Sequence, residues 1–186
     1  MPAAQPSPAV SQIRPESYPV DGRKVAIVAD DDADISAVKD AVKAVEKAGM
    51  MPFVLAGHGG FLGGKDVEIQ RTLLTTRSIE FDAALLVSAI APAADANPVV
   101  DAKAGDPSGI PNNAVDPRLT ILLGEMYRHC KAIAYLPEGE VALAAAGVSA
   151  DAVGVVAEKK ADAAIAQLAK LLGSHRVWER FTPRSA

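Results

Sequence analysis

The sequence predicts an α/β domain in which helices cover both faces of a doubly wound parallel β-sheet, giving three layers, α/β/α. Short continuous apolar runs of strand length recur along the chain, as expected for parallel strands that are buried on both faces. Segments with apolar residues at helical spacing lie between these runs. About half of the residues (49%) are apolar and only 4% are aromatic, which suits helices packed closely on a sheet. The length of 186 residues is enough for one domain with a sizeable core.

The first strand and helix follow the start of the regular pattern at Lys24. The run VAIVA at 25–29 predicts a strand buried on both faces. Residues 30–34 are expected to form a turn and a helix N-terminus, where carboxylates interact favourably with the helix dipole. A helix over 36–48 follows, and Gly49 is expected to end it. Its apolar face carries Val38, Val42 and Val45.

Two further strands are predicted in the middle of the chain, MPFVLA at 51–56 and AALLV at 83–87. A glycine-rich loop spans 57–64. Residues 67–80 fit either a helix or an extended chain. Residues 88–115 form a long loop with four prolines, and loops of this length are usually functional or disordered.

The segment that begins at Asp116 predicts a helix that leads directly into a buried strand at 132–136. Asp116 is expected to cap this helix, with Pro117 at its first position, because proline has no N–H that would lack a partner there. A shorter helix over 138–146 should then end at Gly147.

The last third of the chain repeats the alternation of strand and helix. The run VGVVA at 153–157 predicts a fifth strand, and residues 161–172 predict a helix that ends at Gly173. Residues 175–181 are expected to make a last helical turn. No internal repeat is present. This alternation is typical of the flavodoxin-like doubly wound fold.

Charge and composition exclude several classes of partner. The formal net charge is −4 and the pI is near 5.4, which does not favour binding to nucleic acid or to an anionic membrane. The single cysteine excludes an internal disulfide and a zinc site built from cysteines. No apolar run approaches the ~18 residues that span a bilayer, and no secretory signal is visible at the N-terminus. We expect a soluble, cytoplasmic protein.

The N-terminal segment differs in composition from the rest. Residues 1–22 carry five prolines and little periodicity, so we expect an extended linker arm there. The folded domain is expected over 23–182, with a short tail at 183–186. A proline-rich arm before a domain suggests that another domain normally lies upstream.

Three consecutive carboxylates, Asp30 to Asp32, follow the first strand. In receiver domains such carboxylates hold magnesium beside a phosphorylatable aspartate that ends the third strand, and a lysine ends a later strand. Here those strand ends are followed by Ser88, Pro137 and Glu158. The pattern therefore favours a solvated helix start over a receiver site.

Neither the glycine-rich loop nor the histidines match a known binding motif. The loop GHGGFLGG at 57–64 lacks both GxxxxGK[ST] and GxGxxG, and it follows the second strand and not the first. It is interpreted as a flexible turn. The histidines His58, His129 and His175 do not lie at metal-ligand spacing to one another or to Cys130. No metal site is predicted.

Cys130 lies next to His129, but the pair does not predict a nucleophile and its base. Adjacent helical residues point about 100° apart and do not face each other. A nucleophile elbow places the reactive side chain after a strand, on a sharp turn that opens a helix. Cys130 precedes its strand, and the residue after that strand is Pro137. The position favours a buried structural thiol.

Several stretches of the sequence resemble the C-terminal domain of the large-subunit haem catalases. That domain is itself similar to the PfpI-type and class I glutamine amidotransferase-like proteins, including glyoxalases, which have a flavodoxin-like fold. The resemblance covers about residues 20–181, and its most specific parts are YRHCKAIA and HRVWER. The stretches are GRKVAIVADD (22–31), SIEFDAALLVS (78–88), DPRLTILLGEMYRHCKAIAYL (116–136), LAAAGVSADAVGVV (143–156) and LLGSHRVWERF (171–181).

The resemblance implies that peroxide chemistry belongs to a separate haem domain of a parent catalase, in an oxidative stress response. This chain has no distal histidine segment, and its tyrosines do not lie in the RxFxYxD context of the proximal ligand. It is thus expected to hold no cofactor of its own. Its implied partners are the haem domain and the other subunits of a homotetramer, with unfolded client proteins as further candidates.

The resemblance also indicates which residues correspond to an active site. In the superfamily's enzymes a cysteine follows the strand equivalent to 132–136, and a carboxylate near the end of the first strand assists it. Asp30 or Asp31 matches that carboxylate, but Pro137 stands where the cysteine is expected. Ser88 begins the sequence Ser-Ala-Ile, where a Pro-Gly-Gly turn is common. The implied domain is an enzyme fold without its nucleophile.

Three functional hypotheses follow. The first is a non-catalytic domain that supports the stability and assembly of a large catalase and has chaperone-like client binding. The second is a cryptic PfpI-like hydrolase or glyoxalase that uses Cys130. The third is a small-ligand-binding module at the carboxyl ends of the strands. Its candidate lining consists of Asp30, Asp31, His58, Ser88 and Pro137.

Overall fold

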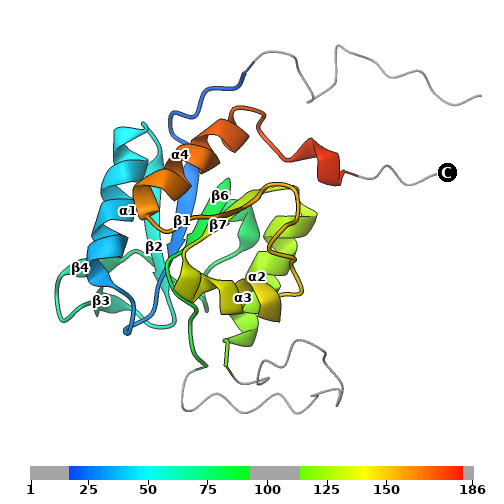
Figure 1. Ribbon diagram of the computed structural model, residues 1–186. Coiled ribbons are helices and arrows are strands. Elements are labelled where there is room, and N and C mark those ends of the chain that lie inside the picture. The colour runs from blue at the N-terminus through cyan, green and yellow to red at the C-terminus, as the bar shows by residue number, and fades with distance from the viewer. Residues whose placement is uncertain (1–16, 93–113, 182–186) are drawn as a thin grey trace, which may run out of the picture.

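The sheet at the centre of the molecule confirms the predicted fold class. The structure is a computed structural model that describes residues 17–92 and 114–181 (Figure 1). The central sheet has six strands in the order β5-β2-β1-β6-β7-β8, and every neighbouring pair is parallel. The strands are β1 (Lys24–Val28), β2 (Met51–Ala56), β5 (Arg71–Thr72), β6 (Ala83–Leu86), β7 (Ala132–Tyr135) and β8 (Val155–Ala157).

Helices cover both faces of this sheet and complete the three layers. α1 (Ile35–Lys47) and α4 (Ala161–Leu172) pack on one face, and α2 (Pro117–Arg128) and α3 (Glu140–Ala145) pack on the other (Figure 1). The central strands supply both cores because successive side chains point to opposite faces. Ile27 lies in the core under α1 and α4, and Val28 lies in the core under α2 and α3. Each such fully buried side chain contributes about 1.5–3 kcal/mol.

The predicted helix starts are confirmed at two aspartates. The Asp34 carboxylate accepts the Ser36 N–H at 2.9 Å and caps α1. The Asp116 carboxylate accepts the Arg118 N–H at 2.8 Å, and Pro117 is the first residue of α2. These local signals satisfy N–H groups that have no partner within the helix.

The two segments between β2 and β6 contain more structure than the sequence indicated. The glycine-rich loop includes β3 (Gly60–Leu62), which forms an antiparallel hairpin with β4 (Val67–Ile69). The ambiguous segment 67–80 holds β4, β5 and a 3₁₀ turn, η2 (Ser78–Glu80), and has no α-helix. The hairpin exists because Leu62 and Ile69 are buried in the core on the α1 side.

Three predicted boundaries in the second half of the chain are corrected. The helix expected over 138–146 begins as a 3₁₀ turn, η3 (Pro137–Gly139), followed by α3. The strand expected from residue 153 starts at Val155, because Gly154 has a φ of +76° and cannot continue an extended strand. The last helical turn is a short 3₁₀ turn, η4 (Trp178–Arg180).

The end of α4 differs in detail from the prediction. Gly173 is its C-cap, but with a φ of −57° it is right-handed, and the left-handed residue is His175 at φ 66°. Of the predicted loop 88–115, residues 93–113 lie outside the described residues, as do residues 1–16 of the arm and the tail from 182.

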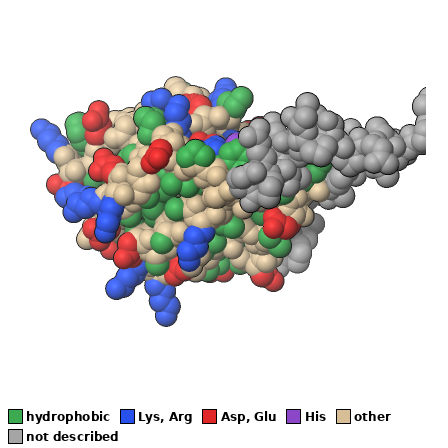
Figure 2. All heavy atoms as spheres, turned by 90° about the horizontal axis from the view of Figure 1, so that it is seen from above, with side chains coloured by type: hydrophobic (Ala, Val, Ile, Leu, Met, Phe, Trp, Pro, Cys, Tyr) green, Lys and Arg blue, Asp and Glu red, His purple; other side chains and the backbone are tan. Residues whose placement is uncertain are grey.

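The described surface mixes both signs of charge. Figure 2 looks from above onto the end of the molecule where the arm enters, and Lys, Arg, Asp and Glu side chains are interspersed there with apolar ones. No helix in the described part of the chain is long and apolar enough to cross a membrane.

Candidate functional site

Asp30 and Ser88 hold the carboxyl ends of the two central strands together. Ser88 follows β6, and its Oγ accepts the Asp30 N–H at 2.9 Å and donates to the Ala89 carbonyl at 3.0 Å. The Asp30 carboxylate accepts the N–H groups of Ala91 at 2.7 Å and of Asp31 at 3.0 Å. Both carboxylate oxygens are therefore engaged by the backbone.

A cleft of about 600 Å³ lies at this carboxyl edge. Asp30, Ser88 and Pro137 line it together, so the structure brings three of the sequence-derived candidates to one place. The cleft lies at the topological switch point between β1 and β6, from which the chain order runs outward in both directions, and open α/β sheets bind ligands at this place. Other charged residues that line it are Asp32, Asp34, Glu138 and Lys159.

Asp31 and His58 form a separate pair. His58 Nε2 lies 3.1 Å from Asp31 Oδ2, and both side chains are exposed. Neither residue lines the cleft. The Gly59 carbonyl, followed by the Asp31 carboxylate, raises the pKa of His58 because both stabilise the protonated ring. The pair ties the glycine-rich loop to the turn after β1.

Cys130 lies at the opposite end of β7 from Pro137 and from the cleft. Its side chain is only 6% exposed, and its Sγ is 4.0 Å from the Arg128 carbonyl. Its backbone is left-handed, with a φ of 56°, because Cys130 ends α2 in a Schellman motif. The N–H of Cys130 bonds to the Tyr127 carbonyl, and the N–H of Lys131 bonds to the Met126 carbonyl, each at 3.0 Å.

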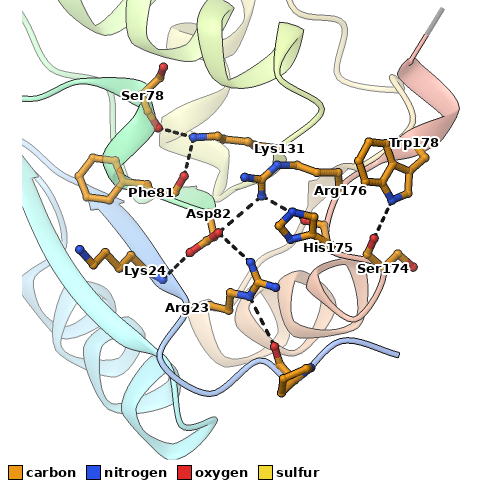
Figure 3. Close-up of polar contacts among 11 residues, drawn as sticks. Arg23, Lys24, Ser78, Phe81, Asp82, Lys131, Ser174, His175, Arg176 and Trp178 are labelled. Carbon is orange, nitrogen blue, oxygen red and sulfur yellow. Dashed lines mark hydrogen bonds and ion pairs between the residues drawn. The ribbon is translucent and has the colours of Figure 1, made fainter. Parts of the chain in front are cut away.

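The sequence did not indicate a half-buried charged cluster at the amino edge of the sheet. Asp82 precedes β6 and accepts the Lys24 N–H and the Arg23 guanidinium, each at 3.0 Å, with the Arg176 guanidinium at 3.5 Å (Figure 3). Burial acts to raise the pKa of Asp82, but these hydrogen bonds and positive charges leave it below its ordinary value. Asp82 thereby joins Arg23, β1 and the C-terminal segment.

Lys131 lies in the same region and is 4% exposed. Its Nζ donates to the Phe81 carbonyl at 2.6 Å and to the Ser78 carbonyl (Figure 3). Burial, with a smaller effect from the nearby Arg176 charge, lowers the pKa of Lys131 to about 8. No sequence signal distinguishes a lysine before a strand that is buried in this way from one that is solvated.

Arg180 joins the C-terminal segment 175–181 to the end of α2. Its guanidinium stacks on the Tyr127 ring at 4.3 Å and donates to the carbonyls of Lys131, at 2.9 Å, and Val153. The Val177 N–H donates to the Cys130 carbonyl at 2.7 Å. The segments YRHCKAIA and HRVWER, which are far apart in sequence, therefore pack against each other. Among the described residues, no group of three or more His, Cys, Asp or Glu side chains is arranged to hold a metal ion.

The fold and these two edges define a three-layer α/β domain with a cleft at its switch point and a charged cluster at the opposite edge. In a comparison with protein-family models, the chain matches the C-terminal domain found in long catalases over residues 21–182. Because the match covers most of the chain, the protein belongs to this family. A search of curated proteins found no match.

Proposed function

We propose that the chain is a non-catalytic domain of a haem catalase, which decomposes hydrogen peroxide, and that it supports the stability and assembly of the enzyme's homotetramer. The observation that carries the proposal is the arrangement around β7. Pro137 follows β7, near the place where the resemblance to PfpI-type enzymes would put their cysteine, and Cys130 lies at the other end of this strand. No thiol therefore faces the cleft in the described residues.

The state of the candidate residues supports this proposal. The Cys130 thiol is buried, and the described residues place no imidazole or carboxylate in hydrogen-bonding contact with it. The oxygens of Asp30 are used by backbone N–H groups, so this carboxylate orders the loops around it. Nucleophilic catalysis by a thiol requires a general base within hydrogen-bond reach that can take its proton.

The haem belongs to the preceding domain in this proposal. Haem iron in catalases is held by a tyrosine, and the tyrosines described here are already engaged. The Tyr127 ring is covered by Arg180, Tyr135 is 7% exposed, and Tyr18 packs against His175. The protein is proposed to act in the cytoplasm.

The test compares a long catalase that carries this domain with a version from which the domain is deleted. We expect the deleted version to lose activity faster on heating and to dissociate into smaller species at lower temperature. Equal inactivation rates and equal tetramer fractions would contradict the proposed role. In parallel, the isolated chain is assayed for peptide, ester and methylglyoxal turnover. Activity that Cys130→Ala abolishes would favour a cryptic hydrolase or glyoxalase instead.

A second candidate function is the binding of a small ligand in the carboxyl-edge cleft. Its volume of about 600 Å³ lies within the range of small-molecule sites. A ligand at a hundredfold excess over its Kd would stabilise the fold by about 2.7 kcal/mol. A thermal-shift screen with nucleotides and flavins tests this candidate, and a panel without any shift would remove it.

Chaperone-like binding of unfolded clients is proposed as an additional activity. The described surface exposes large apolar side chains, of which Ile79 (85%) and Leu74 (69%) are the most open, and client binding would bury such side chains against apolar segments of the unfolded protein. The test follows heat-induced aggregation of an unrelated enzyme by light scattering, with the chain at an equimolar ratio. An inert protein of similar charge is the control, and equal scattering with both would exclude the activity.

A further inference from the structure

We propose that the groove beside the C-terminal segment 175–181 is the surface on which the catalytic domain of a long catalase docks. This inference rests on the proposed function and names the face through which the two domains meet. The groove has a volume of about 840 Å³. We call it the tail groove, and it is lined by Tyr127, Arg128, Cys130, Val153, Glu179 and Phe181, with Arg180 in its wall.

The tail groove lies at the edge of the sheet where the chain enters the domain. The Tyr18 N–H donates to the Gly173 carbonyl at 2.7 Å, and the Tyr18 ring packs against His175 at 5.2 Å. The C-terminal segment that follows Gly173 also borders the groove, through Arg180 and Phe181. Figure 1 shows residues 17–22 and the C-terminal segment 175–181 together at one end of the molecule. In a long catalase the catalytic domain precedes this one, so this end is the one that faces it.

The chemistry of the tail groove fits a protein surface. Val153 and Phe181 are each 57% exposed, and the Tyr127 ring contributes further apolar lining. Arg128 and Glu179 are exposed charges at the groove, and neither forms an ion pair with another described residue. An apolar centre with charges around it is the usual composition of an interface between proteins.

This composition specifies what the catalytic domain must present. An apolar side chain fits between Val153 and Phe181, an acidic group fits opposite Arg128, and a basic group fits opposite Glu179. The carboxyl-edge cleft offers no such match among the described residues, whose charged side chains there are four carboxylates and Lys159.

The wall of the tail groove is rigid, which favours docking without rearrangement. The Arg180 guanidinium is fixed by its stack on Tyr127 and by two carbonyls. Gly154 packs so closely that a Cβ there would lie 2.4 Å from Val177 Cγ2. The groove therefore exists in the isolated domain and does not require a partner to form it.

The experiment measures how fast introduced cysteines are alkylated in the isolated 186-residue chain and in a long catalase that carries this chain as its C-terminal domain. Val153→Cys reports on the tail groove, Leu74→Cys on an open surface position that follows β5 at the far edge of the sheet, and Glu138→Cys on the carboxyl-edge cleft. Each position is exposed in the isolated domain. Mass spectrometry of the labelled peptides separates these thiols from Cys130 and from thiols of the catalytic domain.

We expect the full enzyme to slow labelling of Val153→Cys by about tenfold or more, because access limits the reaction, and to leave the other two rates nearly unchanged. If Leu74→Cys or Glu138→Cys is slowed and Val153→Cys is not, the domains associate through another face and this inference fails alone. If no position is slowed, the inference fails. The deletion experiment then decides separately whether the proposed role in stability fails with it.

A second variant tests the same surface through stability. Phe181→Ser should leave the unfolding midpoint of the isolated chain nearly unchanged, because the side chain is exposed there, and should make the full enzyme dissociate at lower temperature. Leu74→Ser is the matched control and should change neither, because Leu74 is exposed and lies at the far edge of the sheet. Equal behaviour of the two variants in the full enzyme would overturn the proposal.

Discussion

The buried ammonium of Lys131 makes the free energy of unfolding depend on pH in an alkaline window. Burial, and then the Arg176 charge, lower the pKa of Lys131 from its ordinary value of 10.5 to about 8. The unfolded chain therefore binds more protons than the folded chain between these two values, so stability rises with pH across this window. A shift of this size corresponds to about 3 kcal/mol. The full penalty is present below about pH 8 and disappears towards pH 10.5.

The variant Lys131→Met removes this titration, and urea unfolding from neutral to alkaline pH measures the effect. We expect the stability of wild type relative to Lys131→Met to increase by about 3 kcal/mol across the window. At neutral pH the variant is stabilised because it no longer buries a charge. It is also destabilised, because the Ser78 and Phe81 carbonyls lose their hydrogen-bond donor, at a cost of about 1–3 kcal/mol for each carbonyl. Lys65→Met, at an exposed position, controls for the other lysines. A constant difference between wild type and Lys131→Met at all pH values would refute the reasoning.

Three further predictions use the same unfolding assay. Gly139→Ala should destabilise the fold by about 1–3 kcal/mol, because a Cβ there would lie 2.6 Å from the Leu86 carbonyl oxygen. Gly124→Ala is the control, since its Cβ meets nothing within 4 Å, and it should stabilise α2 by up to about 1 kcal/mol. Equal effects of the two variants would contradict the close approach at Gly139. Asp82→Asn should lower the free energy of unfolding by about 1–3 kcal/mol at neutral pH. This loss should shrink in acid, because the lowered pKa of Asp82 confers stability that disappears as pH falls through the pKa of the folded state. A loss that does not vary with pH would argue against this account. Arg180→Lys should cost about 1–2 kcal/mol, since lysine cannot both stack on the ring and bridge two carbonyls; an unchanged midpoint would count against that role.

The parts of the fold that were predictable are those set by local pattern. Strands buried on both faces are continuous apolar runs, so β1, β6 and β7 could be placed within about a residue or two. Asp116 and Pro117 marked the start of α2 because capping depends on residues that are adjacent in sequence.

The β3–β4 hairpin could not be predicted because its strands are too short to show a period. Each has three residues, and the pair is held in place by Leu62 and Ile69 in a core that other elements build. The end of α4 had a different cause. Glycine is favoured at left-handed positions, but the left-handed residue here is His175, whose ring lies between those of Tyr18 and Trp178.

The candidate site also has a part that the sequence predicted and a part that it did not. The positions of Asp30, Ser88 and Pro137 followed from their places after strands, since parallel strands bring their carboxyl ends to one edge. The Asp82 cluster could not be found, because its members come from distant parts of the chain and a charged residue at a strand start is usually solvated. Only the contacts of the folded domain distinguish these residues from surface charges.

The amino edge explains why the two most specific segments have the residues they have. YRHCKAIA supplies the Tyr127 ring, the left-handed turn at Cys130 and the buried ammonium of Lys131. HRVWER supplies Arg180, which stacks on Tyr127 and donates to the Lys131 carbonyl, and Arg176, which pairs with Asp82. Arginine suits these places because its planar fork bridges several acceptors at once. The most distinctive residues of the chain therefore fix the edge at which the arm enters. This distribution agrees with the proposed attachment of this edge to a neighbouring domain.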